Sequence, residues 1–215
     1  MEKVKVVKAY GYHFYKVYDF LPEEELEERF SSATKWLEEN RKPITEEVFP
    51  PEASWRLLEL GFDKEPLWKE YYRRLDIHIK KYCEIIGLLN NTIELHSSWI
   101  TRLKDLDFEG EHDLSELYDR MRQHSTKGNM HAHHKFNPIT TVYYLTNPHP
   151  KYGTSIKFPG DTYQTNVGQE NSLIIFDGRL EHSAIYPPLD MTKNNPRITV
   201  VADYAYIDRV MYKGE

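Results

Sequence analysis

The amino-acid sequence predicts a mainly β protein with flanking helices. Short apolar runs fill the C-terminal half, and turn signals such as Asn147-Pro148 and Pro187-Pro188 separate them, which is typical of closely spaced strands. The expected strands are residues 138–145, 154–158, 171–176, 182–186 and 197–207. Two amphipathic helical segments precede them, and their apolar stripes need a sheet to cover. The combination indicates helices that buttress one face of a β-sandwich.

The first twenty residues are predicted to be strand, with Gly11 as a bend or bulge. A first helix is expected after Pro22, because proline suits the first helical turn and the acidic residues 23–25 suit the positive end of the helix dipole. Pro43 ends this helix. Residues 43–56, which also contain Pro50 and Pro51, are expected to form an irregular connection.

A second helix is predicted from Glu65-Pro66 to about Gly87, because apolar residues recur there at helical spacing. His78 lies beside the apolar stripe of this helix and is interpreted as a solvated or locally bonded histidine. Cys83 is interpreted as a buried, inert thiol.

The pattern changes to that of a strand from Thr92 onward. The charged residues 104–128 are expected to form an inserted loop or lid with a short helix at 113–122. We expect a single domain over residues 1–215, with an N-terminal strand and supporting helices in 1–91 and a β core in 92–210.

Composition and charge narrow the class of protein. Of the 215 residues 40% are apolar, which is enough for a packed interior. The formal net charge of -6 argues against nucleic acid as a generic partner, since phosphate binding normally requires a basic face. The single cysteine excludes an internal disulfide and fits a reducing compartment. Neither a signal peptide nor an apolar run of membrane-spanning length is found, so we expect a soluble, cytoplasmic protein with no membrane partner.

A histidine cluster, His131-Ala132-His133-His134, precedes the apolar run that begins at Ile139. In an extended segment the side chains of residues i and i+2 point to the same side, so His131 and His133 can bind one metal ion while His134 points away. A turn at this point would bring His134 into the ligand set instead. Imidazole suits Fe, Cu, Zn and Ni about equally, so the ligand type does not name the metal. Taken by itself, the motif is also compatible with a solvated loop tip.

Two later residues favour a site over a loop tip. His182 follows the predicted strand at 171–176 and a turn, which places an imidazole at the edge of the core, although a neighbouring carboxylate is an alternative partner for it. Arg197 begins the last predicted strand, two residues ahead of Thr199. A buried arginine is costly unless it meets an anion, so we expect an internal acid or a bound carboxylate beside it.

Several short pieces of residues 93–207 match one known family. They are Ser98-Trp99-Ile100, His131-Ala132-His133, residues 139–145 (ITTVYYL), residues 172–176 (SLIIF), His182 and Arg197-Ile198-Thr199. In these pieces the chain resembles the Fe(II)- and 2-oxoglutarate-dependent oxygenases, in the prolyl-4-hydroxylase-like group that includes small bacterial and phage members. The matching region covers a little over half of the chain, and the combination of pieces is fairly specific.

The resemblance implies a double-stranded β-helix (jelly-roll or cupin-like) core buttressed by the two N-terminal helices. It implies that Fe(II) is bound by His131, His133 and His182. It also implies that the C5 carboxylate of 2-oxoglutarate is bound by Arg197, with Thr199 and Tyr144 assisting. A phage or viral origin is compatible with the same resemblance.

One departure from the family pattern concerns the second ligand. The usual motif is His-x-Asp, whereas this chain has His133 at the acidic position and no Asp or Glu between Asn129 and Asn147. Three neutral imidazoles make the site one charge unit more positive, which favours the dianionic cosubstrate. A histidine there also argues against the halide binding of halogenases of this fold, which have Gly or Ala.

The expected function is that of a dioxygenase, most simply a hydroxylase, that uses Fe(II), 2-oxoglutarate and O2. It would convert 2-oxoglutarate to succinate while it oxidises a small-molecule or peptidyl substrate. Residues 104–128 and 146–153 are the loops expected to close over that substrate. Two alternatives remain. A cupin-like metal-dependent oxygenase without keto acid would not need Arg197, and a non-catalytic β-barrel binding or accessory protein would tolerate loss of the metal.

Overall fold

The computed structural model describes residues 2–41, 53–105, 132, 137–160 and 162–207. The helices and strands in chain order are β1 (Lys3–Ala9), β2 (Tyr12–Tyr18), α1 (Glu23–Glu39), β3 (Ala53–Arg56), α2 (Pro66–Ile86), β4 (Ile93–Leu103), β5 (Ile139–Thr146), β6 (Thr154–Phe158), β7 (Thr162–Asn166), β8 (Ser172–Phe176), β9 (His182–Ala184) and β10 (Arg197–Tyr206). Short 3₁₀ helices lie at Phe62–Lys64, Asn90–Thr92 and Leu189–Thr192. The described chain is therefore mainly β with two helices, as predicted.

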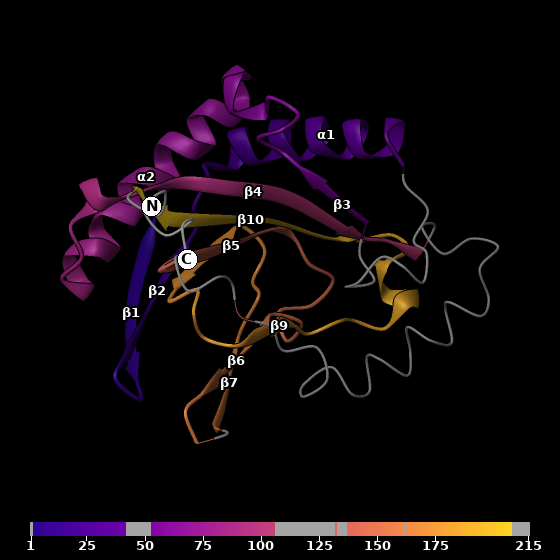
Figure 1. Cartoon of the computed structure of the whole chain (residues 1–215). Coiled ribbons are helices and arrows are strands. Elements are labelled where there is room, and N and C mark those ends of the chain that lie inside the picture. Colours follow the sequence, from indigo (N-terminus) through magenta and orange to yellow (C-terminus); the bar gives the residue numbers. More distant parts are fainter. Residues whose placement is uncertain (1, 42–52, 106–131, 133–136, 161, 208–215) are drawn as a thin grey trace, which may run out of the picture.

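The strands form two antiparallel sheets (Figure 1). The larger sheet has the strand order β1-β2-β8-β5-β10-β4-β3, and the smaller sheet has the order β7-β6-β9. Helices α1 and α2 lie over one face of the larger sheet, and the smaller sheet lies on the opposite side (Figure 1). We call the face of the larger sheet that looks toward the smaller sheet the inner face.

Strand β5 shows how the larger sheet is buried on both of its faces. All 8 of its residues are buried. Tyr143 and Leu145 belong to the apolar core shared with the helices, whereas Val142 and Tyr144 pack in a second core that includes Ile156 of the smaller sheet. Because side chains alternate along a strand, even-numbered residues of this part of β5 face the space between the two sheets.

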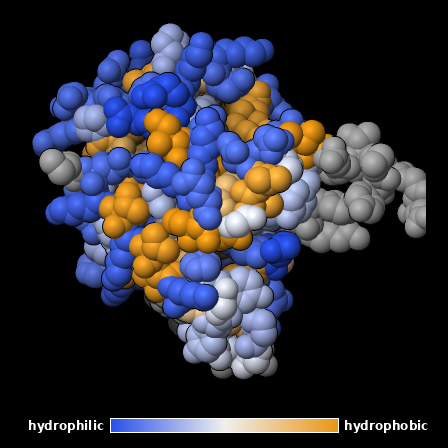
Figure 2. Space-filling model, turned by 90° about the vertical axis from the view of Figure 1, so that its left-hand side faces the viewer, coloured by the Kyte–Doolittle hydropathy of each residue, from blue (hydrophilic) through white to orange (hydrophobic). Residues whose placement is uncertain are grey.

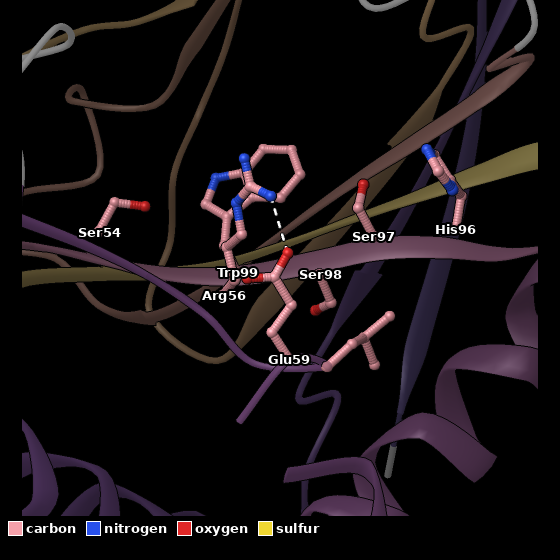
Figure 3. A pocket seen from close by; sticks show the side chains of 8 residues that line it. Ser54, Arg56, Glu59, His96, Ser97, Ser98 and Trp99 are labelled. Atoms are coloured by element: carbon pink, nitrogen blue, oxygen red, sulfur yellow. Dashed lines mark hydrogen bonds and ion pairs between the residues drawn. The ribbon is translucent and has the colours of Figure 1, made fainter. Parts of the chain in front are cut away.

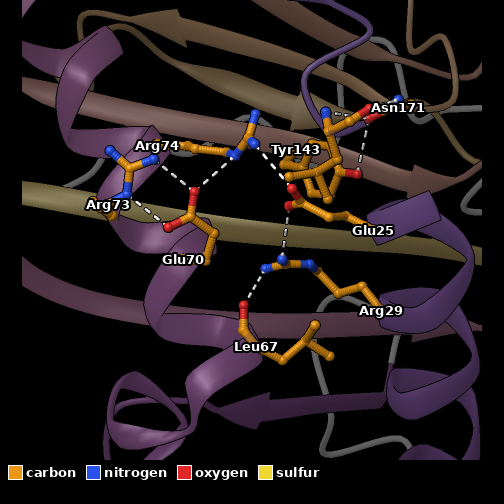
Figure 4. Close-up of polar contacts among 9 residues, drawn as sticks. Glu25, Arg29, Leu67, Glu70, Arg73, Arg74, Tyr143 and Asn171 are labelled. Carbon is orange, nitrogen blue, oxygen red and sulfur yellow. Dashed lines mark hydrogen bonds and ion pairs between the residues drawn. The ribbon is translucent and has the colours of Figure 1, made fainter. Parts of the chain in front are cut away.

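Polar contacts join the two helices to each other (Figure 4). The guanidinium of Arg29, which is only 1% exposed, donates a hydrogen bond to the carbonyl of Leu67 at 2.5 Å and lies 3.5 Å from the carboxylate of Glu25. Glu25 also accepts a hydrogen bond from Arg74 at 3.0 Å. The contacts of Arg29 with Leu67 and of Glu25 with Arg74 link α1 to α2. The two helices therefore form one layer over the sheet.

Several predicted boundaries agree with the structure. Helix α2 begins at Pro66 and ends at Ile86, and Gly87 caps it in the left-handed conformation, with a φ of 71°. The N-terminal segment is two strands of a hairpin instead of one strand, and the bend expected at Gly11 is the turn of this hairpin. Tyr10 and Gly11, with φ of 52° and 86°, form the tight turn between β1 and β2.

Two strands were not predicted. Strand β3 lies in the segment 43–56 that was expected to be irregular, so that prediction is wrong for its last residues, while 42–52 lie outside the described residues. Strand β7 was not expected at all. The predicted lid at 104–128, with its helix at 113–122, falls almost entirely outside the described residues.

The two interpreted residues of helix α2 are both buried. His78 is 3% exposed; its Nδ1 is hydrogen-bonded to the hydroxyl of Tyr15 at 3.1 Å, and its Nε2 pairs with Glu2. The solvated interpretation of His78 is therefore wrong, and its bonded partners are distant in sequence rather than local. Cys83 is buried as predicted, and burial raises the pKa of its thiol to about 11.

The side of the molecule that carries the β1–β2 hairpin shows apolar patches interrupted by hydrophilic side chains (Figure 2). Val4 and Val6 of β1, an edge strand, are each 46% exposed and alternate with lysines. Lysines on an edge strand disfavour pairing with another sheet. Among the helices that the structure describes, neither is apolar enough over a sufficient length to cross a membrane.

Candidate metal and cosubstrate site

A row of polar side chains crosses the inner face of the larger sheet. Tyr144 on β5 is paired with Thr199 on β10 and with Ser172 on β8, and Thr199 is paired with Thr101 on β4. Residues directly opposite each other on neighbouring strands point to the same face. The hydroxyls of Thr101 and Thr199 are hydrogen-bonded at 2.6 Å, and all four residues are buried.

Arg197 lies at the end of this row. It is the first residue of β10, is 2% exposed, and precedes Thr199 by two positions, which places both side chains on one side of the strand. Its guanidinium carbon lies 6.0 Å from the centre of the Tyr144 ring. The structure therefore brings together the three residues that were predicted for the cosubstrate: Arg197, Thr199 and Tyr144.

Tyr144 also connects the two sheets. Its hydroxyl lies 2.5 Å from the hydroxyl of Thr154 on β6. Two hydroxyls need only one O–H between them, so the pair retains a second O–H that can donate to another acceptor. The Tyr144 ring is held from behind by Gly168, where an added Cβ would lie 2.7 Å from the ring. The phenol is thus held in position for binding an acceptor such as a carboxylate.

The segment 146–153, predicted as a closing loop, lies next to this tyrosine. Its buried Asn147 donates hydrogen bonds to the carbonyl of Tyr152 at 2.8 Å and to the carbonyl of Gly168 at 2.6 Å. The first contact closes the segment on itself, and the second ties it to the chain that follows β7. Its movement over a substrate stays a prediction.

His182 faces the same space from the smaller sheet. It is 5% exposed, pairs in register with Ile156, and lies edge-on to Phe176 with ring centres 5.0 Å apart. Its Nδ1 lies 2.8 Å from the carbonyl oxygen of Leu180. Because a carbonyl can only accept, Nδ1 carries the hydrogen, and Nε2 of the neutral ring carries the lone pair. This is the arrangement in which a backbone carbonyl orients a metal-binding imidazole.

The remaining predicted ligands cannot be placed. His131 and His133, and the alternative ligand His134, lie outside the described residues. Within the part of the chain that the structure describes, three or more His, Cys, Asp or Glu side chains do not gather into a group that could hold a metal ion. Of the predicted iron ligands, the structure therefore locates His182 alone.

Three polar residues that line the space between the two sheets were missed by the sequence analysis. Thr101 and Thr154 bond to predicted site residues, but threonine is common in strands and carries no signal of its own. Asp203 is 2% exposed and accepts hydrogen bonds from Thr140 at 2.7 Å and Ser97 at 3.4 Å. An acid inside the apolar run of residues 197–207 was a usable signal for it, because buried carboxylates need partners.

Comparisons with known proteins place this fold. The sequence matches no family model and no curated protein. Its structure is similar to a Pseudomonas putida prolyl-4-hydroxylase, with a TM-score of 0.58, 10% identity, and 90% of this chain and 92% of that chain covered. It is also similar to the non-heme alpha-ketoglutarate-dependent carbocyclase SnoK from nogalamycin biosynthesis, with a TM-score of 0.57, 14% identity, and coverage of 91% and 80%. HygX from Streptomyces hygroscopicus, solved with nickel and 2-oxoglutarate bound, gives a TM-score of 0.51 at 10% identity, with coverage of 91% and 83%.

These similarities define a class of fold. The chain has the mainly antiparallel β architecture, with two helices on one side, that is found in 2-oxoglutarate-dependent oxygenases. At identities of 10–14% the likeness concerns the fold alone. The activity has to be argued from the site residues.

Proposed function

We propose that this protein is an Fe(II)- and 2-oxoglutarate-dependent dioxygenase with a double-stranded β-helix core, and that it acts as a hydroxylase. The observation that carries the proposal is the buried Arg197, which lies beside Tyr144 and Thr199 on the inner face. His182 lies on the opposite sheet, with its Nδ1 bonded to a backbone carbonyl, an arrangement that supports a role in metal binding. The substrate would be a small molecule or a peptidyl residue.

The metal would be bound by His131, His133 and His182. His182 fits this role because the Leu180 carbonyl fixes the ring and leaves Nε2 as the donor atom. Bound Fe(II) would supply the activation of O2 that couples conversion of 2-oxoglutarate to succinate with oxidation of the substrate.

The cosubstrate's C5 carboxylate would be bound at the polar row. Arg197 supplies the positive charge, and Thr199 and Tyr144 supply hydroxyl donors, so the hydrogen bonds are charge-assisted or geometrically fixed. The strand register gives the distance between the carboxylate-binding end of the site and His182. Thr154, which touches Tyr144, and Ile156, which is opposite His182, are two positions apart on β6, or roughly 7 Å along a strand. A five-carbon dicarboxylate suits a separation of this order.

Buried apolar side chains also lie in the space between the sheets. Ile156, Phe158, Ile174 and Phe176 belong to the apolar cluster that fills this space beside His182. A low-dielectric environment strengthens the attraction between Arg197 and a carboxylate. The same apolar cluster would protect a reactive centre from solvent.

The proposal is tested by anaerobic titration of the metal-free protein with Fe(II) and then 2-oxoglutarate. We expect a visible charge-transfer band that appears only when both are present, because the keto acid chelates the iron. Zn(II) in place of Fe(II) is the matched control and should give no band. If iron binding is demonstrated by an independent assay but the band is absent, the cosubstrate assignment is wrong and a cupin-like oxygenase without keto acid is favoured.

A further inference from the structure

A cavity opens at the edge of the inner face, between β3 and β4 (Figure 3). Its volume is about 490 Å³, which is within the range of pockets that hold small molecules. The described residues that line it are Leu58 and seven polar or aromatic residues: Ser54, Arg56, Glu59, His96, Ser97, Ser98 and Trp99. We call it the β3–β4 cavity.

The β3–β4 cavity adjoins the polar row that holds Arg197 at its end. Ser54 is paired with Thr101, and Thr101 is hydrogen-bonded to Thr199 at 2.6 Å. Neighbouring strands are about 4.8 Å apart, so Ser54 lies roughly 10 Å from Thr199 across the sheet. Trp99 follows the same face two positions earlier on β4, at the level of Val201 in β10. A ligand in this cavity would therefore lie beside the proposed cosubstrate.

The lining combines one aromatic surface with small hydrogen-bonding groups. Trp99 is partly exposed, and Figure 3 shows it on the same side of β4 as Ser97, whereas Ser98 points the opposite way. An indole face packs well against the C–H face of a ring. Ser54 and His96 are exposed, and a hydroxyl and an imidazole are groups that hydrogen-bond to ligand hydroxyls. The hydroxyl of Ser97 donates to Asp203 at 3.4 Å, so toward a ligand it would act as an acceptor.

The two charged side chains among the described residues that line the cavity form an ion pair. Arg56 donates a hydrogen bond to the carboxylate of Glu59 at 2.7 Å, and both side chains are largely exposed. An anionic ligand near Arg56 would be repelled by Glu59, and a cationic ligand near Glu59 would be repelled by Arg56. The balance favours a ligand without net charge.

We propose that the β3–β4 cavity binds a neutral, hydroxyl-bearing ring compound, either a glycoside or a nucleoside. Its ring lies against Trp99, and its hydroxyls bond to the short polar side chains along β3 and β4. That this ligand is the substrate rests on the proposed dioxygenase function, because the cavity adjoins the cosubstrate residues. The binding chemistry itself does not depend on that function.

The test uses the full chain without metal or 2-oxoglutarate, so its result is independent of the charge-transfer experiment. Saturation-transfer NMR is recorded with methyl β-D-glucopyranoside, with adenosine, and with the blocked peptide acetyl-Gly-Pro-Gly-amide. We expect saturation of the ring C–H protons of the glycoside or the nucleoside, and the arm that responds identifies the source. Absence of a signal from both, or a stronger signal from the peptide, overturns the proposal.

Variants locate the binding. Trp99→Ala should raise the dissociation constant of the ligand at least about fivefold, because the substitution removes the stacking surface. Trp99→Phe should retain most of the affinity. Tyr10→Asn is the matched control, since Tyr10 is an exposed aromatic residue at the hairpin tip, 63% exposed, and Asn tolerates its positive φ. Equal losses in Trp99→Ala and Tyr10→Asn would overturn the assignment to the cavity.

A charge variant tests the selectivity. Glu59→Gln leaves the positive charge of Arg56 unbalanced at an exposed position, so folding should be unaffected. We expect this variant to bind the anion methyl β-D-glucuronide about two- to fivefold more tightly than the unmodified protein does, in a salt-dependent manner. An unchanged affinity for the glucuronide would contradict the balanced-charge argument.

Discussion

Replacement of Arg197 by glutamine tests the central element of the proposed site. Arg197 is 2% exposed, begins β10, and has its guanidinium carbon 6.0 Å from the Tyr144 ring centre. Glutamine keeps hydrogen-bonding capacity and much of the length but removes the charge. If Arg197 binds the far carboxylate of 2-oxoglutarate, the variant should retain iron and lose cosubstrate affinity.

The magnitude follows from the burial of the site. Truncating one partner of a buried, hydrogen-bonded charge pair costs roughly 2–5 kcal/mol. This corresponds to an increase of about 30-fold to several thousand-fold in the dissociation constant of 2-oxoglutarate. Tyr144→Phe removes only a neutral hydroxyl, which is worth about 0.5–1.5 kcal/mol, so its effect should be about two- to twelvefold.

The assay is titration of 2-oxoglutarate into the anaerobic Fe(II) protein, followed through the charge-transfer band. Arg179→Gln is the matched control, because Arg179 is half-exposed and is not part of the proposed site. Its guanidinium pairs with the carboxylate of Asp177 at a distance of 2.7 Å. Thermal unfolding is measured in parallel. If Arg197→Gln lowers the melting temperature strongly but leaves the affinity for 2-oxoglutarate unchanged, Arg197 is a structural residue and the cosubstrate argument fails.

Three further predictions concern the metal, the packing and the thiol. His133→Ala should reduce iron affinity more than His134→Ala does. If His134 is not a ligand, its replacement should lower iron affinity by at most about 10- to 100-fold. The reverse order in an iron titration would mean that the chain turns after Ala132. Gly153→Ala should destabilise the protein by about 1–3 kcal/mol or more, because the new Cβ would lie 1.8 Å from the Asn166 carbonyl oxygen; an unchanged urea midpoint would refute this. Cys83, with its thiol pKa raised to about 11 by burial, should be unreactive toward a disulfide reagent in the native protein and reactive after unfolding, and rapid native labelling would contradict its burial.

The helices and strands that were predicted correctly are those with a clear pattern of apolar side chains in the sequence. Helix α2 has an apolar stripe between Pro66 and Gly87, and β5 and β8 are rich in β-branched, aromatic and other apolar residues and are buried along their whole length. Strand β7 has the sequence TYQTN and no such pattern, because it is an edge strand of the smaller sheet. Its structure depends on backbone pairing with β6, which composition does not reveal.

Some residues of the candidate site could be predicted from the sequence, but their arrangement across the strands could not. Arg197 was recognisable because a buried arginine needs an anionic partner. Thr199 and Tyr144 were indicated only by the resemblance to the oxygenase family. That Tyr144 lies opposite Thr199 depends on a register shift between Ile198 and Thr199 in the β5–β10 pairing. A one-residue change of register would turn the side chains to the other face, and the sequence does not specify such a shift. Thr154 comes from a different sheet, so only the tertiary structure brings it to Tyr144.

The position of β10 has a consequence for how the protein is made. This strand lies between β5 and β4 in the larger sheet, yet it follows every other strand in the described chain. Its Thr199 is 98 residues from its partner Thr101. Pairings between such distant segments form slowly, because the intervening chain loses conformational entropy before the stabilising contacts have formed. During synthesis, β4 and β5 would leave the ribosome with unpaired edges and would need protection from aggregation until β10 emerges. The strand that completes the sheet also carries Arg197, so a chain that stops before it would lack both a closed sheet and an anion-binding residue.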